Sequence, residues 1–336
     1  MIKIAVDAMG GDHAPLEIIK GSLLAITEYK VHIVLVGVEE TIKPILAELT
    51  GGKKNNKISI VHAPEIVGMS ESPAAAFKKK KESSIAIGLN LLKQGEVNAF
   101  VSAGNTGAVM AASTLTLGRI PGIERPALSV ILPSDNHRVL LMDIGSNVDC
   151  KPEQLVQFAI MGDCYARLVM GVKTPRIGLL SIGEEEEKGN QLVQATFPLL
   201  KEEKINFIGN VESREIFVDR ADVVVCDGFM GNSLIKFAEG LVTYFLTYFK
   251  KACRKSPLAI LGALLLRPAL RRFKKDTDYE EFGGTPLLGI NGVSVISHGK
   301  SEAKAIKNAI RNAVEAVQSN MIESISGAIQ LTQKDQ

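Results

Sequence analysis

The sequence predicts an α/β protein in which helices cover both faces of a mainly parallel sheet. Short runs rich in β-branched residues alternate with longer helical patterns along the whole chain, as in sheets joined by crossover helices. The 336 residues are 46% hydrophobic and 23% charged, so the chain can bury a large core without disulfides. Because no repeat or linker divides it, we expect residues 1–336 to form a single catalytic α/β/α domain.

The expected strands are short apolar runs bounded by polar or glycine-containing turns. They are residues 2–6, 31–36, 58–62, 99–102, 127–132, 139–143, 176–181, 206–208, 222–226 and 293–297. Helical patterns lie between most of them, for example at 152–169 and 301–325. The first run starts almost at Met1, so we expect a strand there rather than a secretory leader.

Composition argues against several classes of protein. Lys plus Arg number 39 and Asp plus Glu 37, a formal net charge of +2, which does not favour nucleic-acid binding. Four scattered cysteines without a CxxC pair indicate a reduced, intracellular protein with neither a zinc ribbon nor a redox motif. The longest apolar run, residues 258–266, is far shorter than the roughly 18 residues of a membrane span.

Six of the expected strands end in a glycine-containing polar turn, mostly followed by a helical pattern. The turns are residues 7–13, 102–107, 143–147, 181–190, 226–233 and 297–301. Because the carboxyl ends of parallel strands face one edge of a sheet, we expect these turns to gather in one crevice. Glycine allows close backbone approach, and a helix N-terminus suits an anion such as phosphate. Ordinary turn chemistry is the alternative explanation.

These turns supply the residues that we expect to contact substrate or phosphate. They are Asp7, Gly10, Gly11, Asp12, His13, Ser102, Gly104, Asn105, Thr106, Gly107, Asp143, Gly145, Asn147, Gly231, His298 and Gly299. The chain has no GxGxxG after its first strand, no complete Walker A loop, no GxSxG elbow and no HExxH helix. We therefore predict no metal and no dinucleotide site.

An anion site without an activated Ser or Cys nucleophile indicates that the bound anion itself reacts. Phosphate needs little activation, because its dianion is well populated near neutral pH. Lys188 offers a point charge for phosphate, and the amide of Asn232 can donate to an oxyanion. The alternatives are an ion-paired surface lysine beside the acidic run 184–187 and a helix N-cap at Asn232.

Residues 241–275 combine positive charge with a long apolar surface. They hold nine Lys or Arg and no acid, so the rest of the chain carries −7. One apolar stripe at helical spacing is formed by Leu241, Tyr244, Phe245, Tyr248 and Phe249. The run 258–266 is apolar all round, and Pro268 should end or bend this second helix.

Three interpretations of residues 241–275 compete. One is a buried helical hairpin, at a dimer interface, with solvated basic ends. Another is a membrane-surface element whose apolar groups enter the interface while Lys and Arg meet anionic head groups. A nucleic-acid patch is disfavoured, since base stacking does not need the leucines at 264–266. The residues expected to contact membrane or carrier are Leu258, Leu261, Leu264, Leu265, Arg267, Arg271 and Arg272.

Together these motifs resemble the PlsX family of bacterial phosphate acyltransferases. The run VDAMGGDHAP at residues 6–15 is similar to the opening signature of that family and is the most specific part of the likeness. The resemblance covers roughly residues 1–320. It continues through residues 102–107, 118–120 with 125–127, 143–149, 207–212, 227–232 and 298–299.

The resemblance implies that acyl-[acyl carrier protein] and inorganic phosphate give acyl phosphate and free carrier protein. It also implies a homodimer, no cofactor, and an α/β/α fold like that of isocitrate and isopropylmalate dehydrogenases. Lys188 and Asn232 match residues of functional importance in the family. A protruding helical hairpin at 241–275 would attach this cytoplasmic protein to anionic lipid at the inner membrane face, upstream of the glycerol-3-phosphate acyltransferase PlsY.

On this basis we expect a phosphate oxygen to attack the thioester carbonyl directly, without a covalent acyl-enzyme. Lys188 would hold phosphate or balance developing charge, Asn232 would orient or stabilise the oxyanion, and the glutamates at 184–187 would point outward. One alternative is a phosphotransacetylase-like enzyme that uses acyl-CoA. A second is a decarboxylating dehydrogenase, for which no nicotinamide or metal site can be assembled. A third is a membrane-bound anion-binding or scaffold protein without activity.

Overall fold

The structure, a computed structural model, describes residues 1–135, 137–254, 256–270 and 283–334. Its strands form one sheet in the order β3-β2-β1-β4-β11-β10-β5-β6-β9-β7-β8. Their bounds are β1 (Ile2–Asp7), β2 (Val31–Gly37), β3 (Ile58–His62), β4 (Ala99–Ser102), β5 (Ala127–Pro133), β6 (Arg138–Met142), β7 (Ile177–Ser181), β8 (Phe207–Glu212), β9 (Val223–Val225), β10 (Thr285–Leu288) and β11 (Val293–Ile296).

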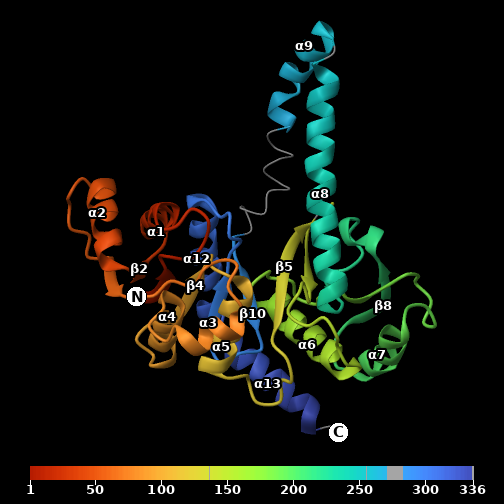
Figure 1. Cartoon of the computed structure of the whole chain (residues 1–336). Helices are drawn as coiled ribbons and strands as arrows, with labels where there is room; N and C mark the ends of the chain where they lie inside the picture. The colour runs from red at the N-terminus through yellow and green to blue at the C-terminus, as the bar shows by residue number, and fades with distance from the viewer. Residues whose placement is uncertain (136, 255, 271–282, 335–336) are drawn as a thin grey trace.

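Helices lie on both sides of this sheet (Figure 1). The α-helices are α1 (Leu16–Glu28), α2 (Glu39–Thr50), α3 (Pro73–Lys79), α4 (Ser84–Lys93), α5 (Thr106–Leu117), α6 (Pro152–Leu168), α7 (Gln191–Glu202), α8 (Gly228–Cys253), α9 (Pro257–Leu265), α12 (Ala303–Gln318) and α13 (Met321–Lys334). A short 3-10 helix, η1 (Ser213–Phe217), follows β8. The predicted mainly parallel α/β architecture is confirmed.

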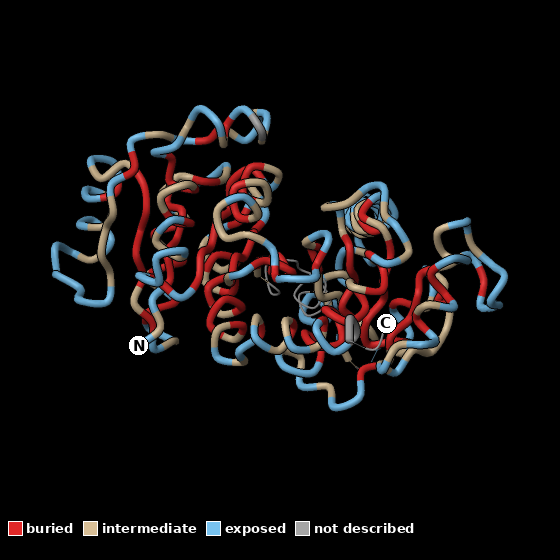
Figure 2. The backbone as a smooth tube through the Cα atoms, turned by 90° about the horizontal axis from the view of Figure 1, so that it is seen from below, coloured by how far each residue is buried: buried red, intermediate tan, exposed pale blue. Residues whose placement is uncertain are grey.

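Successive side chains along the strands pack alternately into the core layers on the two opposite faces of the sheet. Ile4 and Val6 of β1 pack in a core that also takes in α1, α6 and α12, whereas Ala5 faces α4 and α5. In β6, Leu140 joins the first of these cores and Leu141 a third one on the other face. This is the period-2 pattern of a strand buried on both faces. Figure 2 shows the buried residues gathered along the strands and the helix faces against them.

The strands do not all run in one direction. β1, β4 and β11 are mutually parallel, and so are β6, β9 and β7. Between the two sets, β10 is antiparallel to β11, β5 to β10, and β6 to β5. Three reversals leave the second set running opposite to the first. The expectation that all six glycine turns follow parallel strands to one edge is therefore wrong, although it holds within each set.

Two predictions at the C-terminal end also need correction. β10 was missed, because Pro286 lies within its four residues and proline argues against a strand; pairing with both β11 and β5 makes it one nonetheless. The helical pattern 301–325 is two helices rather than one. Asn320, with φ of +49°, separates α12 from α13.

Helices α8 and α9 project from the body as a hairpin (Figure 1). In α8 the only buried residues are Gly228 and Gly231, and α9 has none. The expected protruding hairpin is confirmed, because the rest of the described chain does not bury α8 and α9. The alternative of a hairpin buried at a dimer interface stays a prediction. No described helix combines the length and the apolar character that crossing a bilayer requires.

Candidate functional site

The turns after β1, β4 and β11 meet in a polar cluster, here called the N-terminal cluster and comprising residues 7–13, 102–107 and 297–301. The hydroxyl of Ser102 donates to Asp7 Oδ2 at 2.7 Å and accepts from the Gly104 N–H at 3.0 Å. The Asp12 N–H donates to the Gly299 carbonyl at 2.7 Å. Burial raises the pKa of Asp7, while hydrogen bonds from Ser84 and Ser102 oppose the shift. The three turns therefore hold one another in place.

Most of the polar groups in the N-terminal cluster already have protein partners. A Cβ on Gly10 would overlap a carboxylate oxygen of Asp7, so only glycine fits there. Asn105 caps α5 by accepting from the Ala108 N–H at 3.0 Å, and its amide donates to the carbonyls of Met69 and Glu71, both at 2.9 Å. The buried part of this cluster is thus structural. The predicted residues that face solvent here are Asp12, His13, Thr106 and His298.

The turns after β6, β7 and β9 form a second group, the C-terminal cluster, comprising residues 143–147, 181–190 and 226–233. Asp143 at its centre is fully buried. Its carboxylate accepts the backbone N–H groups of Leu128 and Ser146, both at 3.1 Å, and both the backbone and the amide of Asn147 at 2.7 and 3.0 Å. Burial raises the pKa of Asp143 against the effect of these bonds. The carboxylate organises the turn instead of contacting an anion.

Helix α8 begins directly on this turn. Its N-cap is Asp227, which accepts from the Met230 N–H at 2.8 Å. The Gly228 N–H donates to the Asn147 carbonyl at 2.7 Å. A Cβ on Gly231 would overlap the carbonyl oxygen of Asp143, so the glycine permits this close approach of two backbones. The result places the positive end of the helix dipole at the C-terminal cluster.

Asn232 lies in the first turns of α8, over Gly145. A Cβ built on Gly145, whose φ is +131°, would meet the side chain of Asn232 at 3.6 Å. Asn232 is half-buried, and its amide has no hydrogen-bond partner among the described residues. The N-cap alternative for Asn232 is wrong, because Asp227 takes that role. An unused amide donor thus remains beside the turn.

Lys188 lies on the exposed turn between β7 and α7. Its backbone N–H donates to the Glu185 carbonyl at 3.0 Å, and its ammonium group forms no ion pair within the described part of the chain. The glutamates at 184–187 are all exposed, as expected, and Glu186 pairs with Lys201 at 2.5 Å. The ion-paired alternative for Lys188 is therefore wrong, and its charge is available to a ligand.

Two polar side chains beneath this turn were not among the predicted site residues. The amide of Asn210, in β8, donates to the Glu185 carbonyl at 2.7 Å, while its own Oδ1 lacks a partner. The buried hydroxyl of Ser181 also lacks one. Asn210 lies within the stretch 207–212 that resembles the PlsX family, and Ser181 begins the predicted turn 181–190, but neither was singled out as a site residue. Asn210 thus ties β8 to the turn that carries Lys188.

The strand order brings the two candidate catalytic residues to the same edge of the sheet. β6, β9 and β7 are adjacent and parallel, so their carboxyl ends, which lead to Asp143, Asn232 and Lys188, lie together. A cation, an amide donor and a helix N-terminus are groups that can bind phosphate and stabilise an oxyanion. No three His, Cys, Asp or Glu side chains of the described residues are arranged to hold a metal ion.

The residues expected to contact membrane or carrier lie apart from this edge. Leu258, Leu261, Leu264 and Leu265 are exposed on α9, and Arg267, just beyond that helix, is exposed too. Arg271 and Arg272 fall outside the described residues.

This architecture is the phosphotransacetylase fold. A phosphotransacetylase from Streptococcus pyogenes superposes with a TM-score of 0.66 over 95% of this chain and 94% of that chain, at 16% identity. The EutD phosphotransacetylase from Staphylococcus aureus superposes with a TM-score of 0.59 over 95% of this chain and 94% of its own, at 15% identity. At this identity the likeness shows the fold alone.

Sequence similarity narrows the identification from the fold to a family. Residues 2–324 match the family described as fatty acid synthesis protein, and the chain belongs to it. A phosphate acyltransferase from Heliobacterium modesticaldum is 53% identical over 96% of both chains, and one from Pelotomaculum thermopropionicum is 50% identical over 98% of this chain and 95% of its own. The resemblance to PlsX is confirmed: this is a phosphate acyltransferase of lipid biosynthesis, with acyl and phosphate substrates.

Proposed function

We propose that the acyl donor is long-chain acyl-[acyl carrier protein], that phosphate is the acceptor, and that acyl phosphate and free carrier protein are the products. One observation carries the assignment of the site. Among the described residues, the side-chain donors of Lys188, on the turn after β7, and of Asn232, in α8 after β9, have no partner, and β7 and β9 are adjacent and parallel. The side chains of Asp143, Asn147 and Asp227 beside them, by contrast, are hydrogen-bonded within the protein. We therefore assign Lys188 and Asn232 as the donors of the C-terminal cluster that contact substrate.

The reaction proceeds by direct attack. A phosphate oxygen forms a bond to the thioester carbonyl carbon, and the carbon–sulfur bond then breaks to release the carrier as thiolate. Lys188 holds the phosphate and balances its charge, while Asn232 donates to the oxyanion of the tetrahedral intermediate. Asp143 does not touch substrate; it fixes the backbone on which Asn232 rests.

The remaining parts of the proposal concern assembly and location. Residues 1–336 act as one catalytic unit, supported by a core that takes in strands of both halves, and two copies form a homodimer. The basic, apolar segment 241–275 contacts the carrier, anionic lipid at the inner membrane face, or both, supported by its exposed leucines and its charge. There the acyl phosphate would pass to the acyltransferase PlsY. No resident cofactor takes part.

Release of free carrier protein from long-chain acyl-carrier protein tests the donor and the site together. The protein should release carrier only when phosphate is present, and acyl-CoA should replace the carrier poorly. Lys188→Ala should reduce the rate by about 10²-fold or more. Lys201→Ala, which removes a nearby lysine paired with Glu186, is the matched control. Near-full turnover by Lys188→Ala would remove Lys188 from the mechanism.

Flotation with liposomes tests the lipid part separately. Vesicles that contain anionic lipid should carry the protein with them more strongly than neutral vesicles, and added salt should weaken the binding. Equal binding to neutral vesicles would contradict the electrostatic part of the proposal.

A further inference from the structure

Exposed apolar side chains lie at the edge of the sheet that carries Lys188 and Asn232, here called the catalytic edge. Three of them are Val148, in the turn after β6, Ile182, in the turn after β7, and Phe229, in the first turn of α8. Single exposed apolar side chains are common on protein surfaces. Their position relative to the two donors therefore decides what these three can bind.

The position of Ile182 is tied to that of Lys188. Ile182 precedes Gly183, and a Cβ built on Gly183 would meet side-chain carbons of Lys188 at 2.9 and 3.4 Å. The stem of Lys188 therefore lies over the backbone next to Ile182. A phosphate held by Lys188 has an apolar side chain near it that phosphate itself cannot use.

Phe229 and Val148 lie beside Asn232 in a similar way. Phe229 precedes Asn232 by three residues on α8, so the two side chains share a face of the helix. Val148 follows Asn147, whose carbonyl accepts the N–H of Gly228 at 2.7 Å. The turn after β6 thus meets the beginning of α8 directly between Val148 and Phe229.

The strand register sets the distance over which these side chains are spread. Val225 of β9 pairs with Met142 of β6 on one side and with Leu179 of β7 on the other. The three strands therefore reach the catalytic edge together, and two strand spacings, roughly 10 Å, separate β6 from β7. An elongated apolar group can extend over this distance while its reacting end lies between Lys188 and Asn232.

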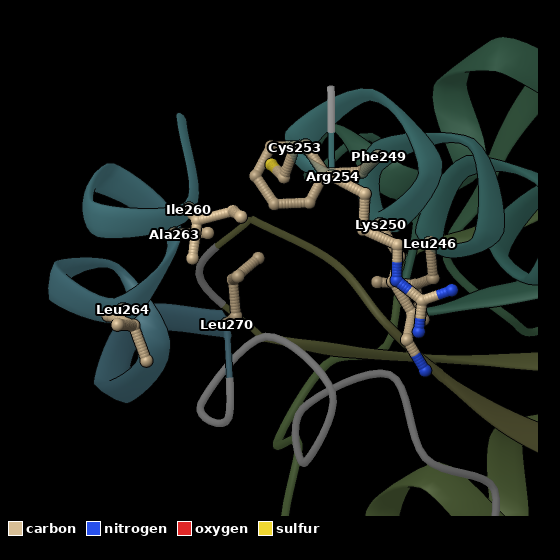
Figure 3. A pocket seen from close by; sticks show the side chains of 9 residues that line it. All are labelled: Leu246, Phe249, Lys250, Cys253, Arg254, Ile260, Ala263, Leu264 and Leu270. Carbon is tan, nitrogen blue, oxygen red and sulfur yellow. The ribbon is translucent and has the colours of Figure 1, made fainter. Parts of the chain in front are cut away.

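These side chains are separate from the apolar surface of the projecting hairpin. Figure 3 shows Leu246 of α8 and Ile260 of α9 within that hairpin. Leu246 follows Asn232 by 14 residues on the same helix, which corresponds to roughly 21 Å at 1.5 Å per residue. The substrate atoms nearest to Asn232 therefore meet the side chains of the catalytic edge and not those of the hairpin.

We propose that Val148, Ile182 and Phe229 bind the part of the acyl chain nearest to the thioester. The inference rests on the proposed function, in which Lys188 and Asn232 hold the reacting groups. Of the two substrates, phosphate is wholly polar, and only the acyl substrate carries an apolar chain away from the carbonyl carbon. A bound chain removes the three side chains from water, so they favour long acyl groups over short ones.

The ratio of kcat/KM for palmitoyl-carrier protein to kcat/KM for acetyl-carrier protein tests this proposal on the full-length enzyme. The two substrates share the carrier, the thioester and the phosphate acceptor and differ only in the chain. Ile182→Ser should lower the ratio about tenfold, because a large apolar contact with the chain is lost. Val148→Ser removes a smaller contact and should lower the ratio about threefold.

Val218→Ser is the matched control for Val148→Ser. The two valines are 54% and 57% exposed, so both changes add the same polar group to a similar surface. Val218 precedes Asp219, which pairs with Arg176 at the opposite end of β7. The ratio should stay at the wild-type value in Val218→Ser.

Photocrosslinking locates the chain independently of turnover. An acyl-carrier protein with a diazirine close to the carbonyl end of its chain, mixed with enzyme without phosphate, should label the peptides that hold Val148, Ile182 or Phe229. Excess palmitoyl-carrier protein should suppress this labelling, and mass spectrometry of the peptides measures both. Labels confined to the hairpin, or labels that palmitoyl-carrier protein does not suppress, would overturn the proposal.

Three further outcomes would overturn it. An unchanged ratio in both Ile182→Ser and Val148→Ser would place the chain elsewhere, and equal losses with the two substrates would assign these side chains to the carrier itself. Dissociation of an oligomer by either variant, measured by analytical ultracentrifugation, would assign them to contact with a second copy. Wild-type enzyme that does not turn over palmitoyl-carrier protein contradicts the proposed function, whereas turnover with an unchanged ratio contradicts only the acyl-chain site.

Discussion

At its beginning, α8 is packed so closely that two of its residues must be glycine, whereas its outer half exposes aromatic side chains to solvent. Gly228 and Gly231 lie against the Asp143 turn. Further along, Tyr244 and Phe245 are 66% and 54% exposed. The beginning of α8 is thus packed tightly against the turn after β6, whereas the side chains of its outer half are exposed. Changes at the two ends should therefore affect different properties.

The segment 241–275 and the rest of the chain also differ in net charge. The whole chain is nearly neutral at +2, but residues 241–275 carry +9 and the remainder −7. The acidic body includes the exposed run 184–187 beside Lys188, and the basic arm has no acid to neutralise it. We therefore expect an anionic partner to be attracted to the arm before it reaches the catalytic edge.

The largest expected effect is that of Gly231→Ala at the beginning of α8. The added Cβ would overlap the Asp143 carbonyl oxygen, and a backbone cannot give way as a flexible side chain does. We expect a loss of at least about 3 kcal/mol in the free energy of unfolding, measured with urea. Gly240→Ala, in the same helix with open space around it, should be neutral or stabilise by up to about 1 kcal/mol. Similar values for the two variants would show that α8 does not dock as described.

Asn232→Ala should come next, and should act on the rate rather than on stability. Loss of one oxyanion donor lowers kcat by about 10²–10³-fold. Asn232→Asp keeps the shape of the side chain but has no N–H to donate. The kcat of this variant should therefore be as low as that of Asn232→Ala. Steady-state kinetics with acyl-carrier protein and phosphate measure both variants. An aspartate variant with normal kcat would mean that Asn232 does not act as a hydrogen-bond donor.

Asn210→Ala should have an intermediate effect, because it acts through the turn that carries Lys188. The Glu185 carbonyl loses its donor, at a cost of about 1–2 kcal/mol in stability. A looser turn should also raise KM for phosphate. If KM for phosphate stays the same while stability falls, Asn210 is structural and does not position Lys188.

On the arm, Leu265→Ser should leave the fold almost unchanged. Leu265 is 76% exposed, so the free energy of unfolding should change by less than about 0.5 kcal/mol. Binding to anionic vesicles should weaken about tenfold, since transfer of a leucine side chain from water contributes about 1.5–3 kcal/mol. A large loss of stability without loss of vesicle binding would place α9 in the core of an assembly.

Cys150, beside Gly228 at the beginning of α8, gives the smallest effect. Burial, together with the charges of Asp143 and Asp227, raises the pKa of Cys150 to about 11. A thiol with a raised pKa stays protonated, so its alkylation should be slow at pH 8 and rise about tenfold per pH unit until pH approaches 11. Peptide-resolved alkylation rates measure this. A plateau near pH 9 would contradict the burial of Cys150 beneath α8.

Lys188 and Asn232 could be proposed from the sequence because their residue types suit phosphate and an oxyanion and because each follows a strand that β-branched residues make recognisable; their catalytic roles stay predictions. The reversal of direction at β5 and β10 depends on which strands pair, and no local pattern encodes that. Asn210 was missed for the same reason, since its function depends on a carbonyl 25 residues away.

Release of carrier in a single turnover, followed by rapid quenching with and without phosphate, tests the central claim most directly. If phosphate itself attacks the thioester at the Lys188–Asn232 edge, mixing enzyme with acyl-carrier protein alone should release no free carrier, and adding phosphate should release it together with acyl phosphate. A burst of one free carrier per active site without phosphate would mean that the enzyme is acylated first, and it would contradict direct attack.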